Sequence, residues 1–562
     1  MSEEIITTPL DHHFALLMRR LHGAPDAELE HVARTVSAWR GAGHTCVPLG
    51  ELGGEGLAEK LQASPVVGEP GEFKPLILDA AGRVYLQRYW AYEADLAAAI
   101  RARLVDAECD SALLVAGLKR LFPKAKKGDG QRAAAEMAVQ KRFAVITGGP
   151  GTGKTYTAAR VLALLAEQFS AHGKNPRLAL AAPTGKAAAR LQESIARALA
   201  QMPETEPLRR TPPGEASTLH RLLGTLPDSP QFRHTRGNPL AVDVVLVDEA
   251  SMVDLALMAK LFAAVPPSAR VILLGDKDQL ASVEAGNVLG DICGSGNPLQ
   301  TATIAPHIAE LKTVHRFGES SGIQALSERV NAGDADGALA LLHEGKYADL
   351  RRTPTPAART LGTALKPHVL EGCREFLEQT DPAAALARVN AFRILCATRR
   401  GPFGVENLNA LATHILADAG LIAPDAAHYH GRPVLIGTND YQLRLFNGDV
   451  GLIFRDPESG NELRAFFIDA TGALRRVLPA RLPTHETSYA MTIHKSQGSE
   501  FDRVLLVLPD RDTPVATREL LYTGLTRARS SIDIWADDPL IIAALARRTQ
   551  RTSGLRDALW RA

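Results

Sequence analysis

The sequence predicts an α/β protein with two α/β domains, and three patterns lead to this prediction. Between Gln131 and about Leu299 the chain alternates apolar, strand-like runs with helical patterns, as in "FAVITG", "RLALAAPTG", "VDVVLVDEA" and "RVILLGD". Such alternation is typical of a parallel sheet with helices on both faces. A second series of α/β signals follows Thr303 and includes "RILCAT", "RVLLVLP" and "SIDIWA". In the first series a glycine-rich turn separates a strand-like run from a helical one, as phosphate-binding loops do.

The size and composition indicate a multidomain globular protein. Its 562 residues correspond to three or four domains of roughly 150 residues each. The net charge is only +1, so a nucleic-acid surface would have to be local. The opening "MSEEIITTPLDHH" lacks the apolar region of a signal peptide, and no window approaches the ~20 apolar residues of a membrane span. We therefore expect a cytoplasmic protein.

The segments outside the first α/β series predict the remaining domains. Residues 1–115 mix helical and strand patterns without a catalytic constellation, and 116–130 contain the basic, glycine-containing "PKAKKGDGQR", which we interpret as a linker. The first α/β domain is predicted over 131–302, with a small proline-rich insertion at about 200–216. The second is predicted over 303–435 and 485–562. Short alternating strands with glycine turns in 436–484 predict a small antiparallel barrel inserted into it.

The strongest motif is a phosphate-binding loop. Gly148–Thr155 reads GGPGTGKT and fits G-x-x-x-x-G-K-[ST], between a strand and a helix as the motif requires. Glycines let backbone N–H groups converge on phosphates, Lys154 would reach the β- and γ-phosphates, and Thr155 would bind Mg²⁺. We therefore predict ATP and Mg²⁺ as cofactors, with the nucleotide contacting Gly148, Gly149, Pro150, Gly151, Thr152, Gly153, Lys154, Thr155 and Tyr156.

Two further strand ends carry polar groups suited to hydrolysis. Asp248 and Glu249 follow "VVLV"; Asp248 would hold Mg²⁺, and Glu249 would orient and deprotonate the attacking water. Gln279 follows "VILLGDKD" and would touch the γ-phosphate, although a solvated loop glutamine is an open alternative.

These motifs, in this order, resemble those of the superfamily-1 DNA helicases. "APTGKAAARL", "STLHRLLG", "LKTVHRF", "YAMTIHKSQGSEFDRVLLVLP" and "LLYTGLTRAR" extend the resemblance, and "GPFGVENLN" and "NDYQLRLFNGDVG" narrow it to the RecD family, the alpha subunits of exodeoxyribonuclease V (the RecBCD complex). The resemblance implies two RecA-like P-loop domains, an inserted SH3-like β-barrel and an N-terminal α+β domain that docks onto a partner subunit.

The resemblance also implies roles for four residues. Arg316 and Arg527, in motifs assigned to the second domain, would be arginine fingers that stabilise the transferring phosphoryl group when the domains close. Glu500 would contact the nucleotide or its γ-phosphate from the far side. Gln131 fits a glutamine that reads adenine, with a polar residue at a helix start as an equal alternative.

Residues at strand ends are the candidate DNA contacts. Hydroxyl, imidazole and amine groups there would grip the DNA backbone rather than the bases, so binding should depend on salt and hardly on sequence. His220 and His494 could instead pack between the domains. The candidates are Thr184, Lys186, Thr218, His220, His494, Lys495 and Ser496.

The function implied by the resemblance is that of an ATP-dependent 5′→3′ helicase, the motor subunit of a RecBCD helicase-nuclease that acts in recombinational repair and degrades linear DNA. Its partners would be DNA and RecB and RecC subunits, and it would carry no nuclease site of its own. Two alternatives are a free-standing RecD-like helicase and a non-catalytic scaffold. In residues 1–115 the cluster Tyr85, Tyr89, Trp90 and Tyr92 would mark the docking surface, or would simply pack in a core.

Overall fold

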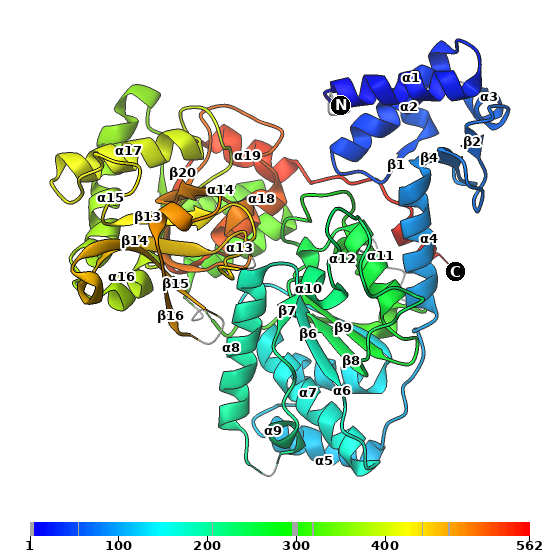
Figure 1. The fold of residues 1–562 in the computed structure, drawn as a ribbon, viewed down its shortest axis with the longest axis horizontal. Coiled ribbons are helices and arrows are strands. Elements are labelled where there is room, and N and C mark those ends of the chain that lie inside the picture. Colours follow the sequence, from blue (N-terminus) through cyan, green and yellow to red (C-terminus); the bar gives the residue numbers. More distant parts are fainter. Residues whose placement is uncertain are drawn as a thin grey trace.

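The computed structural model of the chain describes residues 5–53, 56–204, 206–294, 302–316, 320–440, 442–469 and 472–561. Three bodies are visible: an N-terminal unit, a first α/β domain below it, and a second α/β domain beside both (Figure 1). No helix of these described residues is both long and apolar enough to cross a membrane.

The N-terminal unit is a four-stranded sheet, in the order β1-β4-β3-β2, covered by helices. Strands β3 and β4 flank an Ala-Ala-Gly turn and pair antiparallel. The elements are α1 (Pro9–His22), α2 (Ala27–Gly41), β1 (Cys46–Pro48), α3 (Leu57–Gln62), β2 (Val67–Gly68), β3 (Leu76–Leu78), β4 (Arg83–Leu86) and α4 (Gln87–Arg101).

The first α/β domain is built on a six-stranded, all-parallel sheet in the order β10-β5-β9-β8-β6-β7. Its central strands are buried along their whole length, which is why they read as continuous apolar runs. The elements are α5 (Ser111–Leu121), α6 (Gly130–Gln140), β5 (Phe143–Gly148), α7 (Lys154–Ala171), β6 (Leu178–Ala182), α8 (Gly185–Gln201), α9 (Pro207–Arg210), β7 (Ser217–Thr218), α10 (Leu219–Leu223), β8 (Val244–Val247), α11 (Leu255–Ala264), β9 (Arg270–Gly275), α12 (Val288–Ile292) and β10 (Ile308–Leu311).

The boundaries of this domain differ from those predicted. Helix α5 overlaps the predicted linker 116–130, and its buried Leu118 and Leu121 belong to the core of the first domain. Strand β10 was assigned to the second domain, but it pairs with β5. The predicted insertion contributes only the short helix α9, whose Leu208 is buried in the same core. Apolar side chains on these short helices were therefore misread as linker or insertion, because their packing partners are distant in the sequence.

The second α/β domain has a five-stranded parallel sheet in the order β11-β20-β19-β12-β18. The insert predicted over 436–484 is a five-stranded antiparallel sheet, β16-β15-β14-β13-β17, that spans 432–487. The elements are α13 (Gly322–Ala332), α14 (Ala335–Glu344), β11 (Leu350–Thr353), α15 (Leu361–Leu377), α16 (Pro382–Val389), β12 (Phe392–Cys396), α17 (Val405–Asp418), β13 (Arg432–Ile436), β14 (Val450–Asp456), β15 (Glu462–Ile468), β16 (Leu474–Val477), β17 (His485–Thr487), β18 (Ala490–Thr492), β19 (Phe501–Val507), α18 (Arg518–Leu525), β20 (Ala528–Trp535) and α19 (Asp538–Ala546).

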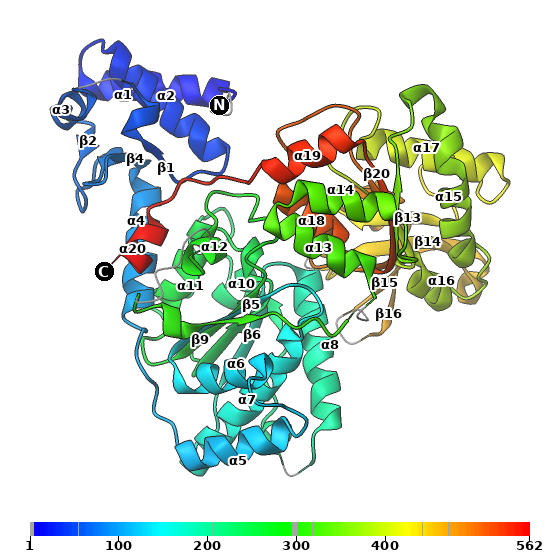
Figure 2. The same cartoon turned by 180° about the vertical axis from the view of Figure 1, so that it is seen from behind.

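The C-terminal tail was assigned to the second domain, but it returns to the other two bodies. After α19 the chain crosses to α4, where α20 (Leu555–Trp560) packs (Figure 2). The fully buried carboxylate of Glu93 on α4 accepts hydrogen bonds from Thr45, Ser553 and the backbone of Gly554. Trp560 donates from Nε1 to backbone carbonyls of α12. The tail therefore joins all three bodies.

Candidate nucleotide and DNA site

The phosphate loop connects β5 to α7, and its shape requires glycine. Gly151 and Gly153 have φ of 79° and 82°, the left-handed region that other residues avoid. A Cβ on Gly151 would lie 2.4 Å from Cβ of Arg316, and one on Gly153 would lie 2.2 Å from Nε2 of Gln131. The glycines therefore set both the turn and the close approach of two predicted site residues.

The side chains of the loop are arranged around its own carbonyl groups. The Lys154 ammonium donates to the carbonyl oxygens of Gly148 (2.6 Å) and Gly149 (3.1 Å), so it lies over the loop where phosphates would bind. Gln131, at the start of α6, donates from Nε2 to the Thr152 carbonyl at 2.9 Å. Both predicted residues therefore reach the loop.

The acid pair lies at the end of β8. Asp248 is half-buried, and desolvation, followed by the charge of Glu249, raises its pKa to about 7. Glu249 has φ 51° and ψ 40°, a left-handed conformation that is costly for a non-glycine residue and is often stored at functional sites. A cation bound at Asp248 would stabilise its charged carboxylate against desolvation and against the charge of Glu249. Carboxylate and hydroxyl oxygens are ligands that Mg²⁺ prefers, so Asp248 and Thr155 fit this metal.

The end of β9 connects the two domains. Asp276, which is 1% exposed, accepts hydrogen bonds from Nε2 of Gln279 (3.0 Å) and from the hydroxyl of Tyr522 on α18 (3.1 Å). Leu280 extends further across: its N–H donates to Thr523 Oγ1 at 3.0 Å, and its side chain is buried in the core of the second domain. The loop that carries Gln279 is therefore held by both domains.

A cavity of about 320 Å³ lies between these elements and unites residues of both domains. Thr155, Asp248 and Glu249 come from the first domain, and Glu500 and Arg529 from the second. Arg316 lies on the segment that links the domains, directly after β10, and not within the second domain as predicted. The remaining lining residues are Ala187, Arg190, Glu193, Ser194 and Arg197 of α8.

Glu500 is the centre of an ion-pair network in this cavity. Its carboxylate accepts hydrogen bonds from Arg316 and, at 3.0 Å, from Nε of Arg529. Burial alone would raise its pKa, but the guanidinium groups of Arg316, Arg190 and Arg529 outweigh burial and hold the pKa at about 2. Glu500 is therefore an anion that faces the predicted phosphate position.

Several predicted nucleotide contacts do not line this cavity, among them Lys154, Gln131 and Gln279, and two others are engaged in packing elsewhere. Arg527 is 3% exposed and donates to the carbonyl oxygens of Thr523 (3.0 Å) and Ser499 (3.1 Å), so its guanidinium is held inside the second domain. The Tyr156 ring stacks under Arg160, 3.1 Å from the guanidinium carbon, on the outer surface of α7. Packing engages both side chains in this arrangement, and their nucleotide contacts stay predictions.

The candidate DNA contacts divide into structural and accessible groups. The Thr184 and Thr218 hydroxyls accept from backbone N–H groups and cap helices α8 and α10. Ser496 is fully buried and donates to the Ile493 carbonyl, so its predicted DNA contact is wrong. Lys495 forms an ion pair of 2.6 Å with Glu486 of β17.

Three candidates remain near the surface. His220 packs edge-on against Phe232, with 5.7 Å between the ring centroids. His494 is half-buried, and burial lowers its pKa. Lys186 lies at the start of α8, where burial and then Arg190 lower its pKa to about 7.

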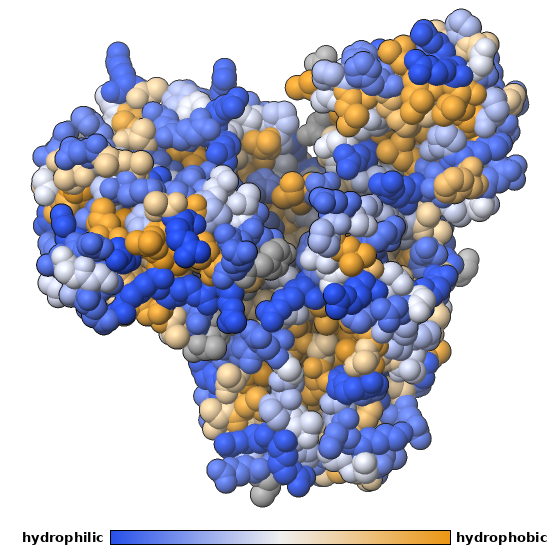
Figure 3. Space-filling model, in the orientation of Figure 1, coloured by the Kyte–Doolittle hydropathy of each residue, from blue (hydrophilic) through white to orange (hydrophobic). Residues whose placement is uncertain are grey.

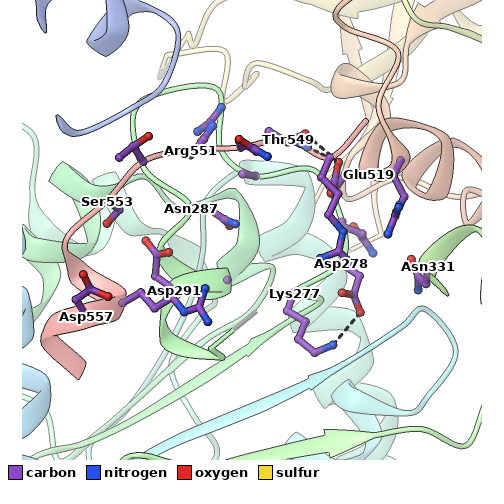
Figure 4. A pocket seen from close by; sticks show the side chains of 18 residues that line it. Lys277, Asp278, Asn287, Asp291, Asn331, Glu519, Thr549, Arg551, Ser553 and Asp557 are labelled. Carbon is purple, nitrogen blue, oxygen red and sulfur yellow. Dashed lines mark hydrogen bonds and ion pairs between the residues drawn. The ribbon is translucent and has the colours of Figure 1, made fainter. Parts of the chain in front are cut away.

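A second cavity of about 420 Å³ lies between the two domains and the tail (Figure 4). Figure 4 shows Asp291, Ser553 and Asp557 together on one side and the Lys277–Asp278 pair, 3.0 Å apart, on the other. Burial, with Glu93 adding to it, raises the pKa of Asp291 to about 8. The tail therefore covers an acidic group on the first domain.

Sequence reasoning missed four residues that the structure brings to the site: Arg190, Leu280, Tyr522 and Arg529. Three lie inside quoted motifs, "APTGKAAARL" and "LLYTGLTRAR", and Leu280 directly follows Gln279. Their positions were visible, but only the folded contacts reveal their roles.

The fold and the cavity define a P-loop nucleotide-binding protein whose second parallel-sheet domain faces the phosphate loop. Family models match as an AAA domain over residues 131–285, as a UvrD-like helicase C-terminal domain over 487–532 and as the N-terminal domain of RecBCD enzyme subunit RecD over 3–60. The chain is 42% identical to the RecBCD enzyme subunit RecD of Mycolicibacterium smegmatis, over 99% of this chain and 98% of that one. The chain belongs to the RecD family.

Two further relatives and one solved structure have lower identity to the chain. The RecBCD enzyme subunit RecD of Haemophilus influenzae is 38% identical over 78% of this chain and 73% of its own length. The ATP-dependent RecD2 DNA helicase of Deinococcus radiodurans is 32% identical over 85% of this chain and 59% of its own length. A crystal structure of Bacteroides Pif1 bound to ssDNA aligns with 74% of this chain and 94% of that chain, at 18% identity and a TM-score of 0.40.

Proposed function

We propose that this chain is an ATP-driven 5′→3′ DNA helicase, with two RecA-like domains, that works as the motor subunit of a RecBCD-type helicase-nuclease in double-strand break repair. The observation that carries the proposal is the 320 Å³ cavity to which both domains contribute. Because Glu500 and Arg529 face Asp248 and Glu249 across it, a change in the nucleotide alters how the domains hold each other. That coupling is what converts hydrolysis into movement along DNA.

The residues in and beside the cavity have separate tasks in this proposal. Lys154 would exchange its carbonyl partners for the β- and γ-phosphates, and Thr155 and Asp248 would hold Mg²⁺, which supplies positive charge against the phosphates. Glu249 accepts a proton from the attacking water. Gln279, bonded to Asp276, lies beside Leu280, so it would report the state of the γ-phosphate to the second domain.

The DNA track would run from the start of α8 onto the insert. Gly185 of α8 packs closely against Phe446 of the insert, where a Cβ on Gly185 would lie 2.9 Å from the Phe446 Cβ, and a cavity of about 390 Å³ beside them is also lined by Arg444. The lining also includes the charged residues Glu215, Arg221 and Arg475. Arg444 is exposed on a tight turn with φ 49°. A cation and an aromatic ring beside a helix N-terminus suit the backbone and bases of a single strand.

The N-terminal unit would dock onto a RecB- or RecC-like subunit, but through a different surface from the one predicted. Tyr85 is 1% exposed, and Tyr89 bonds Arg40, so the aromatic cluster is occupied within the chain. Helix α1 and the residues before it instead expose Ile6, Leu10, Leu17 and Leu21, which are 46–85% accessible. Figure 3 shows hydrophobic residues gathered on this body. Such a patch marks a protein interface.

The experiment that tests the motor function is Lys154→Ala in the full chain, assembled with its partner subunits. We expect loss of DNA-stimulated ATP hydrolysis by at least about 100-fold, because the phosphate charge loses its main counter-ion. Lys174→Ala, an exposed lysine beyond the end of α7, is the control and should retain wild-type turnover. Unchanged hydrolysis in Lys154→Ala would favour the scaffold alternative.

A further inference from the structure

Two guanidinium groups donate hydrogen bonds to the Glu500 carboxylate. Only one of them, that of Arg316, is a predicted phosphate contact. Arg316 and Arg529 each donate to a different oxygen of the same carboxylate. Arg316 is 22% exposed and Glu500 19%, whereas Arg529, at 49%, lies at the mouth of the cavity. Glu500 therefore binds Arg316 on the more buried side of the network and Arg529 on the more exposed side.

The backbone of Arg316 is fixed at the phosphate loop, but its side chain is not fully satisfied. The N–H of His315 donates to the Gly151 carbonyl at 2.8 Å, which sets the position of Arg316 against the loop. Among the described residues, Nη1 of Arg316 is buried without a hydrogen-bond partner. A guanidinium with one occupied and one free donor edge, beside a phosphate loop, is poised to take a second acceptor.

An arriving γ-phosphate and Glu500 compete for this guanidinium. When Arg316 moves its hydrogen bond to phosphate, Arg529 is the guanidinium that stays hydrogen-bonded to Glu500. Asp248 and Glu249 line the same cavity, so the carboxylate faces two other acids and the phosphate charge. Without Arg529 the half-buried carboxylate would lose its last hydrogen-bonded partner, which is strongly unfavourable. Arg316 would then stay with Glu500 instead of moving to the phosphate.

We propose that Arg529 is a positioning residue for hydrolysis: it keeps Glu500 paired while Arg316 transfers its hydrogen bond from this carboxylate to the transferring phosphoryl group. This inference rests on the proposed ATPase function. No covalent bond changes in the exchange; one hydrogen bond is broken and another forms. Arg529 acts through Glu500 and does not touch the phosphate.

The other cations of the cavity are not placed for this task. Arg197 forms an ion pair of 2.6 Å with Glu193 within α8. Arg190 is also on α8, where its charge interacts with both Glu500 and Glu249, but no hydrogen bond joins it to Glu500 among the described contacts. Arg529 is the cation that binds the carboxylate directly beside Arg316.

The test is steady-state, DNA-stimulated ATP hydrolysis by Arg529→Gln in the assembled complex. We expect kcat to fall about 10- to 100-fold, with the KM for ATP changed less than about threefold, because the phosphate loop is untouched. The control is Arg503→Gln on the neighbouring strand β19, where the arginine pairs with Glu371 and Glu375 of α15. It should match the wild type.

A second substitution separates this role from a structural one. Glu500→Gln, added to Arg529→Gln, removes the charge that Arg529 neutralises, so kcat should recover at least about fivefold over Arg529→Gln alone. A wild-type kcat in Arg529→Gln, or a double variant no faster than it, would overturn the inference. Both results presuppose an active wild-type enzyme; a wild type without DNA-stimulated hydrolysis would instead refute the proposed function.

Discussion

Leu280→Ala tests whether the loop after β9 transmits the state of the nucleotide to the second domain. Leu280 belongs to a loop of the first domain, yet its side chain is 5% exposed within the core of the second. Its N–H donates to Thr523 Oγ1 at 3.0 Å, and its carbonyl accepts from Gln497 Nε2 at 2.9 Å. The substitution keeps the two backbone bonds and removes only the apolar contact between the domains.

The expected magnitude follows from the burial. Leucine-to-alanine changes in cores cost about 2–5 kcal/mol, and we take the lower end because this side chain packs between two domains. About 2 kcal/mol corresponds to a factor of about 30 in an equilibrium constant. Because the lost contact joins two domains, the substitution should weaken the closed arrangement of the domains. The free energy of unfolding of each domain should change little. We expect kcat to drop about tenfold or more, with nucleotide affinity nearly unchanged.

The assay combines DNA-stimulated ATP turnover, DNA unwinding and thermal unfolding in the assembled complex. Val283→Ala, three residues further along and 78% exposed, is the matched control and should behave as wild type. A Leu280→Ala variant with wild-type turnover and unwinding would refute the reasoning. So would a large fall in melting temperature with unchanged kcat, because the side chain would then stabilise a domain and not the coupling.

Two further predictions concern the tail cavity and the DNA track. In the folded chain Asp291 keeps its proton to about pH 8, whereas in the unfolded chain it loses the proton near pH 3.8. The free energy of unfolding therefore falls as pH rises between these values, by at most about 1.4 kcal/mol per pH unit. Asp291→Asn should therefore gain melting temperature relative to wild type from pH 5 to pH 8 and level off above; a constant difference would contradict this. Arg444→Asn keeps a residue that tolerates the positive φ, and it should reduce the slope of log binding constant against log salt concentration for single-stranded DNA by about 0.7. The control Arg455→Gln, also on the insert, should leave this slope unchanged. Equal slopes for Arg444→Asn and wild type would exclude Arg444 from the DNA track.

Much of the nucleotide site could be predicted from local sequence. A phosphate loop is made of consecutive residues, and its glycines are required by backbone geometry, so Gly148–Thr155 was identified without a fold. Asp248 and Glu249 follow a buried strand, and the carboxyl ends of parallel strands share one edge of the sheet. Glu500, which directly precedes β19, was placed by the family resemblance alone. The alternation of strands and helices likewise determined two parallel sheets.

The remaining predictions failed where a side chain's partner is far away in the sequence. Arg527 and Arg529 are two residues apart in one motif, but only packing decides that the first bonds carbonyl groups inside its domain and the second reaches Glu500. Ser496 was a plausible DNA contact until burial removed it from the surface.

By itself, therefore, the sequence determined the chemistry that short segments carry: the glycine loop, the acids at strand ends and the order of the elements. Only the tertiary structure decided the groups that work in pairs across the cleft, the strand β10 that joins the first sheet, and the tail that returns to α4. The physical reason is that backbone geometry and hydrophobic periodicity are local properties of a chain. Ion pairs and burial depend on which distant segments meet.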